Sequence, residues 1–257
     1  MTKPRPPAAW PPGVLTLAID VGGTSMKASV LNAKGAMITD QVKIQTPYPC
    51  TPNDFIETIA KLTNRLPTAH RVSMGFPGLV RHGIVVEVPS LSRDVYGGPA
   101  DPRTVELWRA FDLRGALAAR FKLPVKVAND ADVQGCDAVK GVGFEFVMTL
   151  GTGVGTALFD EGRLLPHLEL SHGPFRPEGT FDVLLGEAQR RTVGKKEWID
   201  RVLEAIEVFY QSLYYDHIYV GGGNAARLKK IDLGPRASIV PNKDGILGGV
   251  RIWELDS

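Results

Sequence analysis

The sequence predicts an α/β protein with two lobes and a cleft between them. The first observation is a continuous apolar run at 14–20, bounded by Pro-Gly and Gly-Gly, which is typical of a buried strand. The second is the Gly-rich turn and further strand that follow it. The third is that strand, Gly-rich turn and strand recur at 145–159. Two such halves favour a ligand site between them.

In the first half, apolar runs and turn residues predict an opening meander of strands. We expect strands at 14–20, 26–31, 36–44, 71–75, 83–88 and 125–128. We expect helices at 54–65, at 113–121 and at 131–139, the first of them capped by Asn53. The stretch 89–102 is expected to be a loop.

In the second half, one long amphipathic helix is the clearest element. We expect it at 196–213, because Trp198, Val202, Ile206 and Phe209 recur near the helical period. Strands are expected at 145–150, 156–159, 164–166, 217–220 and 238–240, a helix at 225–230, and a loop at 173–180.

The expected domain division follows from this order of elements. Residues 1–13 hold five prolines and are expected to be a disordered lead. The N-terminal lobe is expected at 14–128, joined by 241–257, and the C-terminal lobe at 129–240. The lead lacks the apolar stretch of a secretion signal.

Composition excludes several classes of protein. Apolar residues make up 44% of the 257, which excludes a wholly disordered chain. Lys and Arg number 30 against 28 Asp and Glu, so a nucleic-acid partner is not expected. No apolar run reaches the length of a membrane span. Two cysteines far apart in sequence favour a reducing compartment, and we expect a cytoplasmic protein without a membrane partner.

Two Gly-rich turns could bind phosphate. Asp20-Val-Gly-Gly-Thr24 ends a strand, so Gly22, Gly23 and Thr24 could approach an anion while Asp20 holds Mg²⁺ through water. Gly151, Thr152 and Gly153 repeat that arrangement in the other half. Either turn alone could be an ordinary hairpin; one in each lobe favours a clamp on a polyphosphate tail. Neither matches a dinucleotide motif or a P-loop.

Asn129 and Asp130 stand where a strand is expected to meet a helix. A carboxylate there can accept a proton from a substrate hydroxyl, and the Asn129 amide can both donate and accept. The alternative is that one of the two only caps the helix.

Glu169 and His172 are three residues apart and would face one side of a helical turn, which suits a polyhydroxylated ligand. A structural role is the alternative, and no ligand set for zinc is present. Gly221, Gly222 and Gly223 leave room for a flat group or form a flexible connection. His70, His82, His167 and His217 form no predicted cluster.

Six segments together resemble the ROK family of sugar kinases, in the actin/hexokinase/Hsp70 superfamily. They are AIDVGGTSMK, SMGFPGLV, VANDAD, TLGTGVGTALF, ELSH and YVGGGNA, in that order. The segments FDEGRLLPHLELSH, LGEAQRRTVGKKEWIDRV and YYDHIYVGGGNA are similar to the polyphosphate glucokinase-like branch. The resemblance covers about 15–249 and implies a two-lobed actin-like ATPase (ribonuclease H-like) fold and a homodimer.

The resemblance also implies roles for these residues. Asp130 would be the general base and would bind sugar with Asn129, Glu169 and His172. Asp20 would organise Mg²⁺. The phosphoryl donor would lie along residues of three glycine segments and one lysine: Gly22, Gly23, Thr24, Lys27, Gly151, Thr152, Gly153, Gly221, Gly222 and Gly223.

Three features depart from the family pattern. The Cys-rich zinc segment is missing, so no zinc is expected. The acidic sugar ligand that follows that segment has no clear counterpart, Glu178 and Glu187 being the candidates. The net charge of +2 is low for an enzyme of polyanions, so a local basic groove would need residues such as Lys27, Arg103, Arg109 or the pair Lys195-Lys196.

The expected activity is phosphoryl transfer from polyphosphate or ATP to the 6-hydroxyl of glucose. The alternatives are a kinase for mannose, fructose or an N-acetylhexosamine, and a sugar-binding protein without catalysis.

Overall fold

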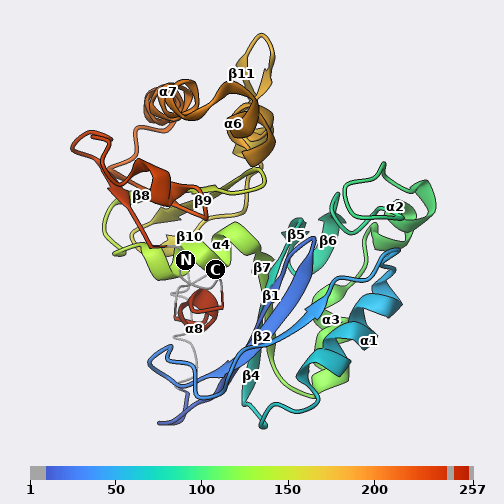
Figure 1. The fold of residues 1–257 in the computed structure, drawn as a ribbon. Coiled ribbons are helices and arrows are strands. Elements are labelled where there is room, and N and C mark those ends of the chain that lie inside the picture. The colour runs from blue at the N-terminus through green and yellow to red at the C-terminus, as the bar shows by residue number, and fades with distance from the viewer. Residues whose placement is uncertain (1–9, 242–245, 255–257) are drawn as a thin grey trace, which may run out of the picture.

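The computed structural model describes residues 10–241 and 246–254, which form two lobes, each around a five-stranded sheet (Figure 1). Most of the predicted lead, 1–9, and part of the predicted joining segment lie outside the described residues. Among the described residues, none of the helices combines the length and apolar character needed to cross a membrane.

The sheet of the first lobe has the order β3-β2-β1-β4-β7. Its strands are β1 (Thr16–Val21), β2 (Ser25–Leu31), β3 (Val42–Gln45), β4 (Arg71–Phe76) and β7 (Val125–Asn129). The first three are antiparallel, and β4 and β7 run parallel to β1. The carboxyl ends of β1, β4 and β7 therefore meet at one edge, which places Asp20 level with Gly75 and Phe76 level with Asn129.

Helices α1 (Pro52–Thr63), α2 (Pro102–Trp108) and α3 (Leu113–Phe121) and the hairpin of β5 (Leu79–Arg81) and β6 (Ile84–Glu87) complete this lobe. Its core is aromatic: Phe55, Phe76 and Trp108 are fully buried, with ring centroids 5.4–5.8 Å apart. Contacts of this kind add to the stabilisation that burial of the rings provides.

The second lobe repeats the topology of the first. Its sheet has the order β10-β9-β8-β13-β14, with β8, β9 and β10 antiparallel and β13 and β14 parallel to β8. The strands are β8 (Phe144–Leu150), β9 (Val154–Asp160), β10 (Arg163–Leu164), β13 (His217–Gly221) and β14 (Ala237–Ile239). This confirms the duplication predicted from the sequence.

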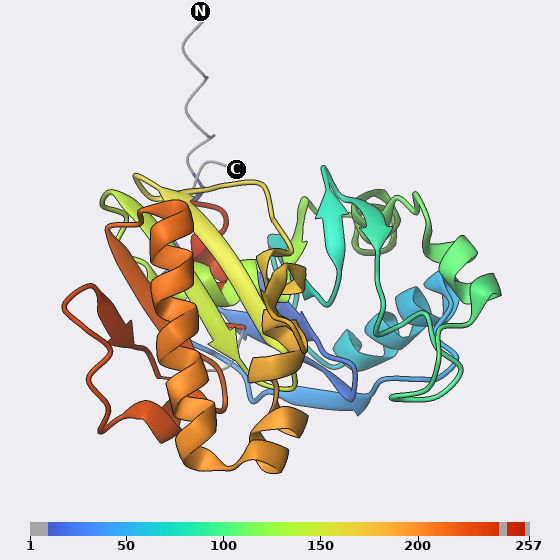
Figure 2. The same cartoon turned by 90° about the horizontal axis from the view of Figure 1, so that it is seen from above.

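One sheet face of the second lobe is covered by helices (Figure 2). They are α5 (Phe181–Leu185), α6 (Glu187–Val193) and α7 (Lys195–Leu213), beside the turns η1 (Leu170–His172) and η2 (Ala225–Leu228) and the hairpin of β11 (Pro174–Arg176) and β12 (Gly179–Thr180). Trp198, Val202 and Phe209 of α7 are buried against the sheet, as their helical spacing predicts.

Two helices lie where the lobes meet. Helix α4 (Asp130–Ala138) contacts β4 of the first sheet and β9 of the second, and α8 (Gly248–Arg251) packs on α4 and β1. A Cβ on Gly248 would lie 2.8 Å from the carbonyl carbon of Val133, so only glycine permits this approach of backbones. Ile246 and Val250 are buried against Ala18, which attaches the chain's last described segment to the first lobe.

Several predicted elements are wrong in extent. Helix α1 begins at Pro52, and Thr51 is its cap in place of Asn53: the Thr51 hydroxyl accepts from the Asp54 amide at 3.3 Å. Pro52 fits the first turn because its nitrogen needs no acceptor there. The predicted strand 36–44 shrinks to β3, because Thr39 bonds the edge of β2 through its side chain.

Other corrections concern short elements. The predicted loop 173–180 contains the β11–β12 hairpin, and the predicted helix 225–230 is the 3₁₀ turn η2. Helices α2, α5, α6 and α8 were not expected. Each has four to seven residues, fewer than an apolar period needs to become visible.

Candidate active site

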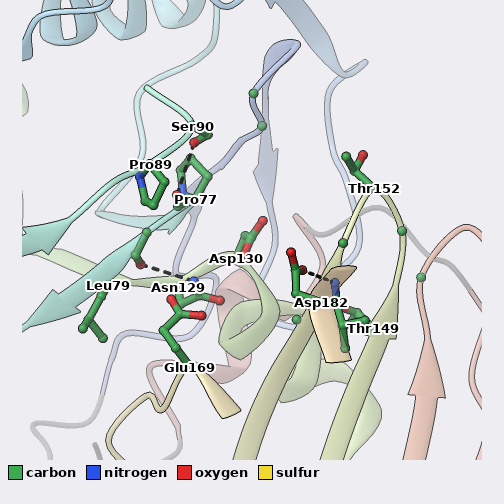
Figure 3. A pocket seen from close by; sticks show the side chains of 18 of the residues that line it. Pro77, Leu79, Pro89, Ser90, Asn129, Asp130, Thr149, Thr152, Glu169 and Asp182 are labelled. Atoms are coloured by element: carbon green, nitrogen blue, oxygen red, sulfur yellow. Dashed lines mark hydrogen bonds between the residues drawn. The ribbon is translucent and has the colours of Figure 1, made fainter. Parts of the chain in front are cut away.

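A cleft of about 500 Å³ lies between the lobes and collects most of the predicted site. Its lining includes Gly22, Gly23, Thr24, Asn129, Asp130, Gly151, Thr152, Gly153, Glu169, His172, Gly222 and Gly223. In Figure 3 the Asp130 side chain lies between Asn129 and Glu169 on one side and Asp182 and Thr152 on the other. Asp20, Lys27 and Gly221 do not line the cleft; they lie in the strands that lead to it.

The first glycine turn joins β1 to β2 and is fixed from its outer side. The Gly22 amide donates to the Ser25 carbonyl at 3.0 Å, which closes the hairpin. The Thr46 hydroxyl donates to the Gly22 carbonyl at 2.7 Å, and the Tyr48 hydroxyl to the Gly23 carbonyl at 2.6 Å. These contacts hold the turn's backbone in one conformation before any ligand arrives.

The second glycine turn joins β8 to β9 and is held by three other segments. The Asn224 side chain donates to the Gly151 carbonyl at 3.2 Å, and the Glu187 amide donates to the Gly151 and Thr152 carbonyls at 3.1 Å. Asp182 accepts from the Val154 amide at 2.8 Å. The roles of Asn224 and Asp182 are not visible in the sequence, because both residues are distant along the chain from the turn that they fix.

The third glycine segment packs directly on the second turn. Gly222 has φ +85°, and a Cβ there would lie 2.6 Å from the Leu150 amide nitrogen. Gly223 has no protein atom within 4 Å of its would-be Cβ and lines the cleft. One glycine is therefore needed by the fold, whereas its neighbour leaves space for a ligand.

Asn129 and Asp130 stand at the junction of β7 and α4, as expected. Asn129 caps α4, since its Oδ1 accepts from the Ala131 amide at 2.8 Å, and its Nδ2 donates to the Gly78 carbonyl at 3.2 Å. The capping alternative is thus correct for Asn129. Asp130 is the first residue of the helix and faces the cleft.

The Asp130 carboxyl is poised to exchange a proton near neutral pH. Burial raises its pKa to about 7, and the negative charge of Asp20 adds to the rise. A Cβ on Gly75 would lie 3.3 Å from the Asp130 Cα and 3.7 Å from the Asp20 Oδ1, so this glycine stands beside both residues. A base is most effective when its pKa lies near the working pH.

His167 belongs to a cluster, contrary to the sequence analysis. Its Nδ1 lies 2.9 Å from Oδ1 of Asp132, and its Nε2 lies 3.4 Å from Oε1 of Glu169. The Glu169 Oε2 faces Nε2 of His172 at 3.8 Å. Asp132 and His167 are 4% exposed, Glu169 is 32% and His172 55% exposed, so the cluster runs from the interior into the cleft.

The charges of this cluster are coupled. Burial alone would lower the pKa of His167, but the hydrogen bond to Asp132 and the negative charges of Asp132 and Glu169 raise it to about 9. The His167 contact in turn lowers the pKa of Glu169. At neutral pH the imidazolium therefore sits beside an ionised Glu169, which can only accept hydrogen bonds.

The candidates for a further acidic sugar ligand lie elsewhere. Glu187 pairs with Arg190 and Arg191 at 2.6–2.8 Å at the start of α6, and Glu178 lies between β11 and β12. Neither lines the cleft. The acidic residues of its lining are Glu87, Asp130, Glu169 and Asp182.

The described lining of the cleft holds no Lys or Arg. The candidates for a basic groove, Lys27, Arg103, Arg109 and the pair Lys195-Lys196, all lie outside it, and Arg109 pairs with Glu106 on the surface at 3.0 Å. The positive charge of His167, which lines the cleft, is paired with Asp132 and Glu169, so a phosphate ligand would be stabilised by further positive charge. Carboxylates of the lining are the oxygen ligands that a hydrated divalent cation takes. Among the described residues, no group of three or more His, Cys, Asp or Glu side chains is placed to hold a metal ion directly.

The chain is similar to known sugar kinases in sequence and in fold. The family model described as "ROK family" matches residues 16–174. A polyphosphate glucokinase of Mycobacterium tuberculosis is 28% identical over 100% of this chain and 99% of its own length. In structure, an inorganic polyphosphate/ATP-glucomannokinase from Arthrobacter is similar with TM-score 0.75 and 27% identity, covering 94% of this chain and 98% of that one.

A ROK family glucokinase from Streptomyces griseus, in complex with glucose and AMPPNP, has a similar fold with TM-score 0.66 and 18% identity, covering 93% of this chain and 98% of that one. These structures confirm the two-lobed, actin-like α/β fold that the motifs predicted.

Proposed function

The chain belongs to the ROK family, and we propose that it is a hexose kinase that phosphorylates the 6-hydroxyl of glucose from polyphosphate or ATP. Full-length similarity to polyphosphate glucokinases supports a hexose kinase. One observation carries the reaction: Asp130, with its pKa raised to about 7, lies in the cleft between a polar cluster and two glycine turns.

The polar cluster is suited to a sugar. Both Oδ1 and Nδ2 of the Asn129 side chain bond backbone groups, so the orientation of this side chain is fixed. The Glu169 carboxylate accepts hydrogen bonds from hydroxyl groups, and the His172 imidazole is exposed enough to reach the ligand. A sugar ring bound by these three residues would present its primary hydroxyl to Asp130.

The glycine turns are suited to the phosphoryl donor. Both turns line the cleft, and each is held from behind by side chains. The residues proposed to border the donor line the cleft: Gly22, Gly23, Thr24, Gly151, Thr152, Gly153, Gly222 and Gly223. Lys27 and Gly221, also expected to do so, lie in the strands that lead to it. The donor's phosphates would lie between the lobes, in line with the hydroxyl that Asp130 faces.

Mg²⁺ would be held near Asp20 through water, and when bound it neutralises the charge of the transferring phosphates. This fits a cleft lining that contains carboxylates and no Lys or Arg among its described residues. The negative charge of Asp20 contributes to the raised pKa of Asp130, and this proximity of two carboxylates supports a cation between them and the donor.

The reaction that follows is a direct displacement. Asp130 accepts the proton of the primary hydroxyl, the oxygen of that hydroxyl forms the new bond to phosphorus, and the bond to the donor's bridging oxygen breaks. Positioning and neutralisation of charge supply most of the rate enhancement in such reactions. The fixed turns and the capped start of α4 are what this chain contributes.

A second substrate is favoured by one comparison. The Arthrobacter protein is called a glucomannokinase, so mannose is the first alternative to glucose. The 2-hydroxyl distinguishes the two sugars, and discrimination depends on whether a residue of the cleft bonds it in one configuration only.

A coupled assay for hexose 6-phosphate tests the proposal. The protein, Mg²⁺ and glucose or mannose are mixed with ATP or inorganic polyphosphate, and Asp130→Asn serves as the inactive control. Formation of glucose 6-phosphate by the wild type alone supports the proposal. Binding of sugar without phosphorylation from either donor would overturn it and indicate a sugar-binding protein.

A further inference from the structure

We infer that His167 is a positioning residue for the sugar: it holds the Glu169 carboxylate in the orientation that accepts hydrogen bonds from the bound hexose. The inference rests on the proposed function and deepens it. We define the relay as Asp132, His167 and Glu169. Its members come from helix α4 and from the segment between β10 and η1.

One side of the relay is a rigid anchor. Asp132 is buried on α4, two residues after the proposed base, and its Oδ1 lies 2.9 Å from Nδ1 of His167. The backbone of His167 is held as well, because its carbonyl accepts from the Arg81 guanidinium of β5. One contact thus holds the imidazole ring of His167, and the other holds its backbone.

The other side of the relay reaches the cleft. Nε2 of His167 is buried and has no hydrogen-bond partner, its nearest acceptor being Oε1 of Glu169 at 3.4 Å. His167 itself lines the cleft. A buried, unpartnered donor is costly, so its persistence here indicates that Glu169, or Glu169 together with a ligand, satisfies it in the working enzyme.

The charges of the relay support this role. The groups that face His167 are Asp132 and Asp130 on α4, Glu169 and His172 on its own segment, and Arg81 on β5. Two of the carboxylates touch the ring, and they raise the pKa of His167 to about 9. A positive ring between two carboxylates keeps Glu169 ionised, and an ionised carboxylate accepts from hydroxyls with both oxygens.

A purely structural His167 would differ in what it does to the sugar. If the residue only filled the interior, its loss would lower stability and leave sugar affinity unchanged. An asparagine at 167 separates the two roles, because its Nδ2 can replace Nδ1 toward Asp132 but it has no atom in the place of Nε2. His167→Asn therefore removes the contact to Glu169 selectively.

The test compares His167→Asn, Glu169→Gln and the double variant with the wild type. His217→Asn is the matched control, because His217 is half-buried, bonds Ser238 at 2.9 Å and lies at the far end of β13 from the glycine segment. The measurements are KM for glucose, KM for the donor, kcat and the midpoint of thermal unfolding, all in the presence of Mg²⁺.

His167→Asn is expected to raise KM for glucose about tenfold, the effect of losing one hydrogen bond to a charged group. The donor KM and kcat should change by less than about threefold. His217→Asn, which loses its bond to Ser238 far from the cleft, should keep the wild-type KM for glucose. Because His167 acts through Glu169, the double variant should be no worse than Glu169→Gln alone.

An unchanged KM for glucose in His167→Asn, or effects that multiply in the double variant, would overturn the inference. If that variant does not fold, the wild type still decides: its KM for glucose should rise above about pH 9, and Glu169→Gln should lack the rise. A wild type that phosphorylates no hexose overturns the proposed function itself.

Discussion

Nδ2 of Asn224 lies 3.2 Å from the carbonyl oxygen of Gly151, and the Asn224 amide donates to the Leu150 carbonyl at 2.9 Å. One residue thus fastens the glycine segment after β13 to the turn between β8 and β9. The two segments are about 70 residues apart in sequence and form one surface of the cleft. Glycines within that surface should respond differently to substitution.

Gly222→Ala and Gly223→Ala form a matched pair of adjacent variants. Gly222→Ala should destabilise the protein by about 2–4 kcal/mol, because a side chain is strained at φ +85° and its Cβ would collide with Leu150. Gly223→Ala should leave the free energy of unfolding unchanged, because the new Cβ would touch no protein atom. It should raise the donor KM, because that Cβ would project into the cleft. Urea unfolding and steady-state kinetics measure both, and an unaltered donor KM in Gly223→Ala would contradict the placement of the donor.

Asp130→Asn should abolish most activity while leaving the fold intact. The loss in kcat should be about 10²–10⁴, the usual contribution of a general base. Asp160→Asn, on the exposed end of β9, is the control and should be fully active. Turnover of Asp130→Asn close to that of the wild type would show that another group accepts the proton.

The same substitution should raise stability. The folded pKa of Asp130 is about 7 and lies above the unfolded value, so its carboxyl costs folding free energy progressively as pH rises from about 4 to 7. Without Mg²⁺ at pH 8, Asp130→Asn should therefore unfold a few degrees above the wild type, and the difference should vanish near pH 4. Calorimetry at both pH values decides; equal midpoints at pH 8 would mean that the carboxyl is not destabilised.

The raised pKa of His167 predicts that the free energy of unfolding falls at high pH. Its folded pKa of about 9 lies above the unfolded value, so its contribution is complete below about pH 6.5 and is lost as pH rises through 9. The free energy of unfolding of the wild type should fall by about 3 kcal/mol over this range. That of His167→Asn should not show this fall. Urea unfolding at pH 6 and pH 10 gives the difference, and parallel losses in both proteins would assign the titration to another group.

Removal of divalent cations should abolish the phosphoryl-transfer activity of the enzyme. The described cleft lining offers carboxylates and no Lys or Arg, and the His167 imidazolium is already paired with Asp132 and Glu169, so a cation would neutralise the donor. Activity should disappear with EDTA and return with Mg²⁺. Asp20→Asn should raise the half-saturating Mg²⁺ concentration at least about tenfold, whereas Asp160→Asn should not. Full activity in EDTA would exclude the proposed role of Asp20.

The sequence predicted the parts of the fold that are locally encoded. Buried strands such as β1 and β8 are continuous apolar runs ended by glycines, and the turns after them were recognised for that reason. The short helices α5 and α6 were missed because their packing against α7 stabilises them more than any local pattern does.

The site residues also divide into those that local sequence reveals and those that only the folded chain brings together. Gly22, Asp130 and Gly151 stand at strand ends, so their sequence neighbours reveal their place at the cleft. His167 was not recognised because its anchor, Asp132, is 35 residues away and on another element. Asp182 was missed likewise, since only the folded chain brings it to the turn that it bonds.

The return of the chain to the first lobe at α8 determines how the cleft can open. The polypeptide enters the second lobe through α4, and α8 packs both on α4, through Gly248, and on β1 of the first lobe. A body attached at two points turns about the line through them and resists sliding. We therefore expect the lobes to rotate about the line through these two points. The two glycine turns then move apart, while the residues at the base of α4 keep their places.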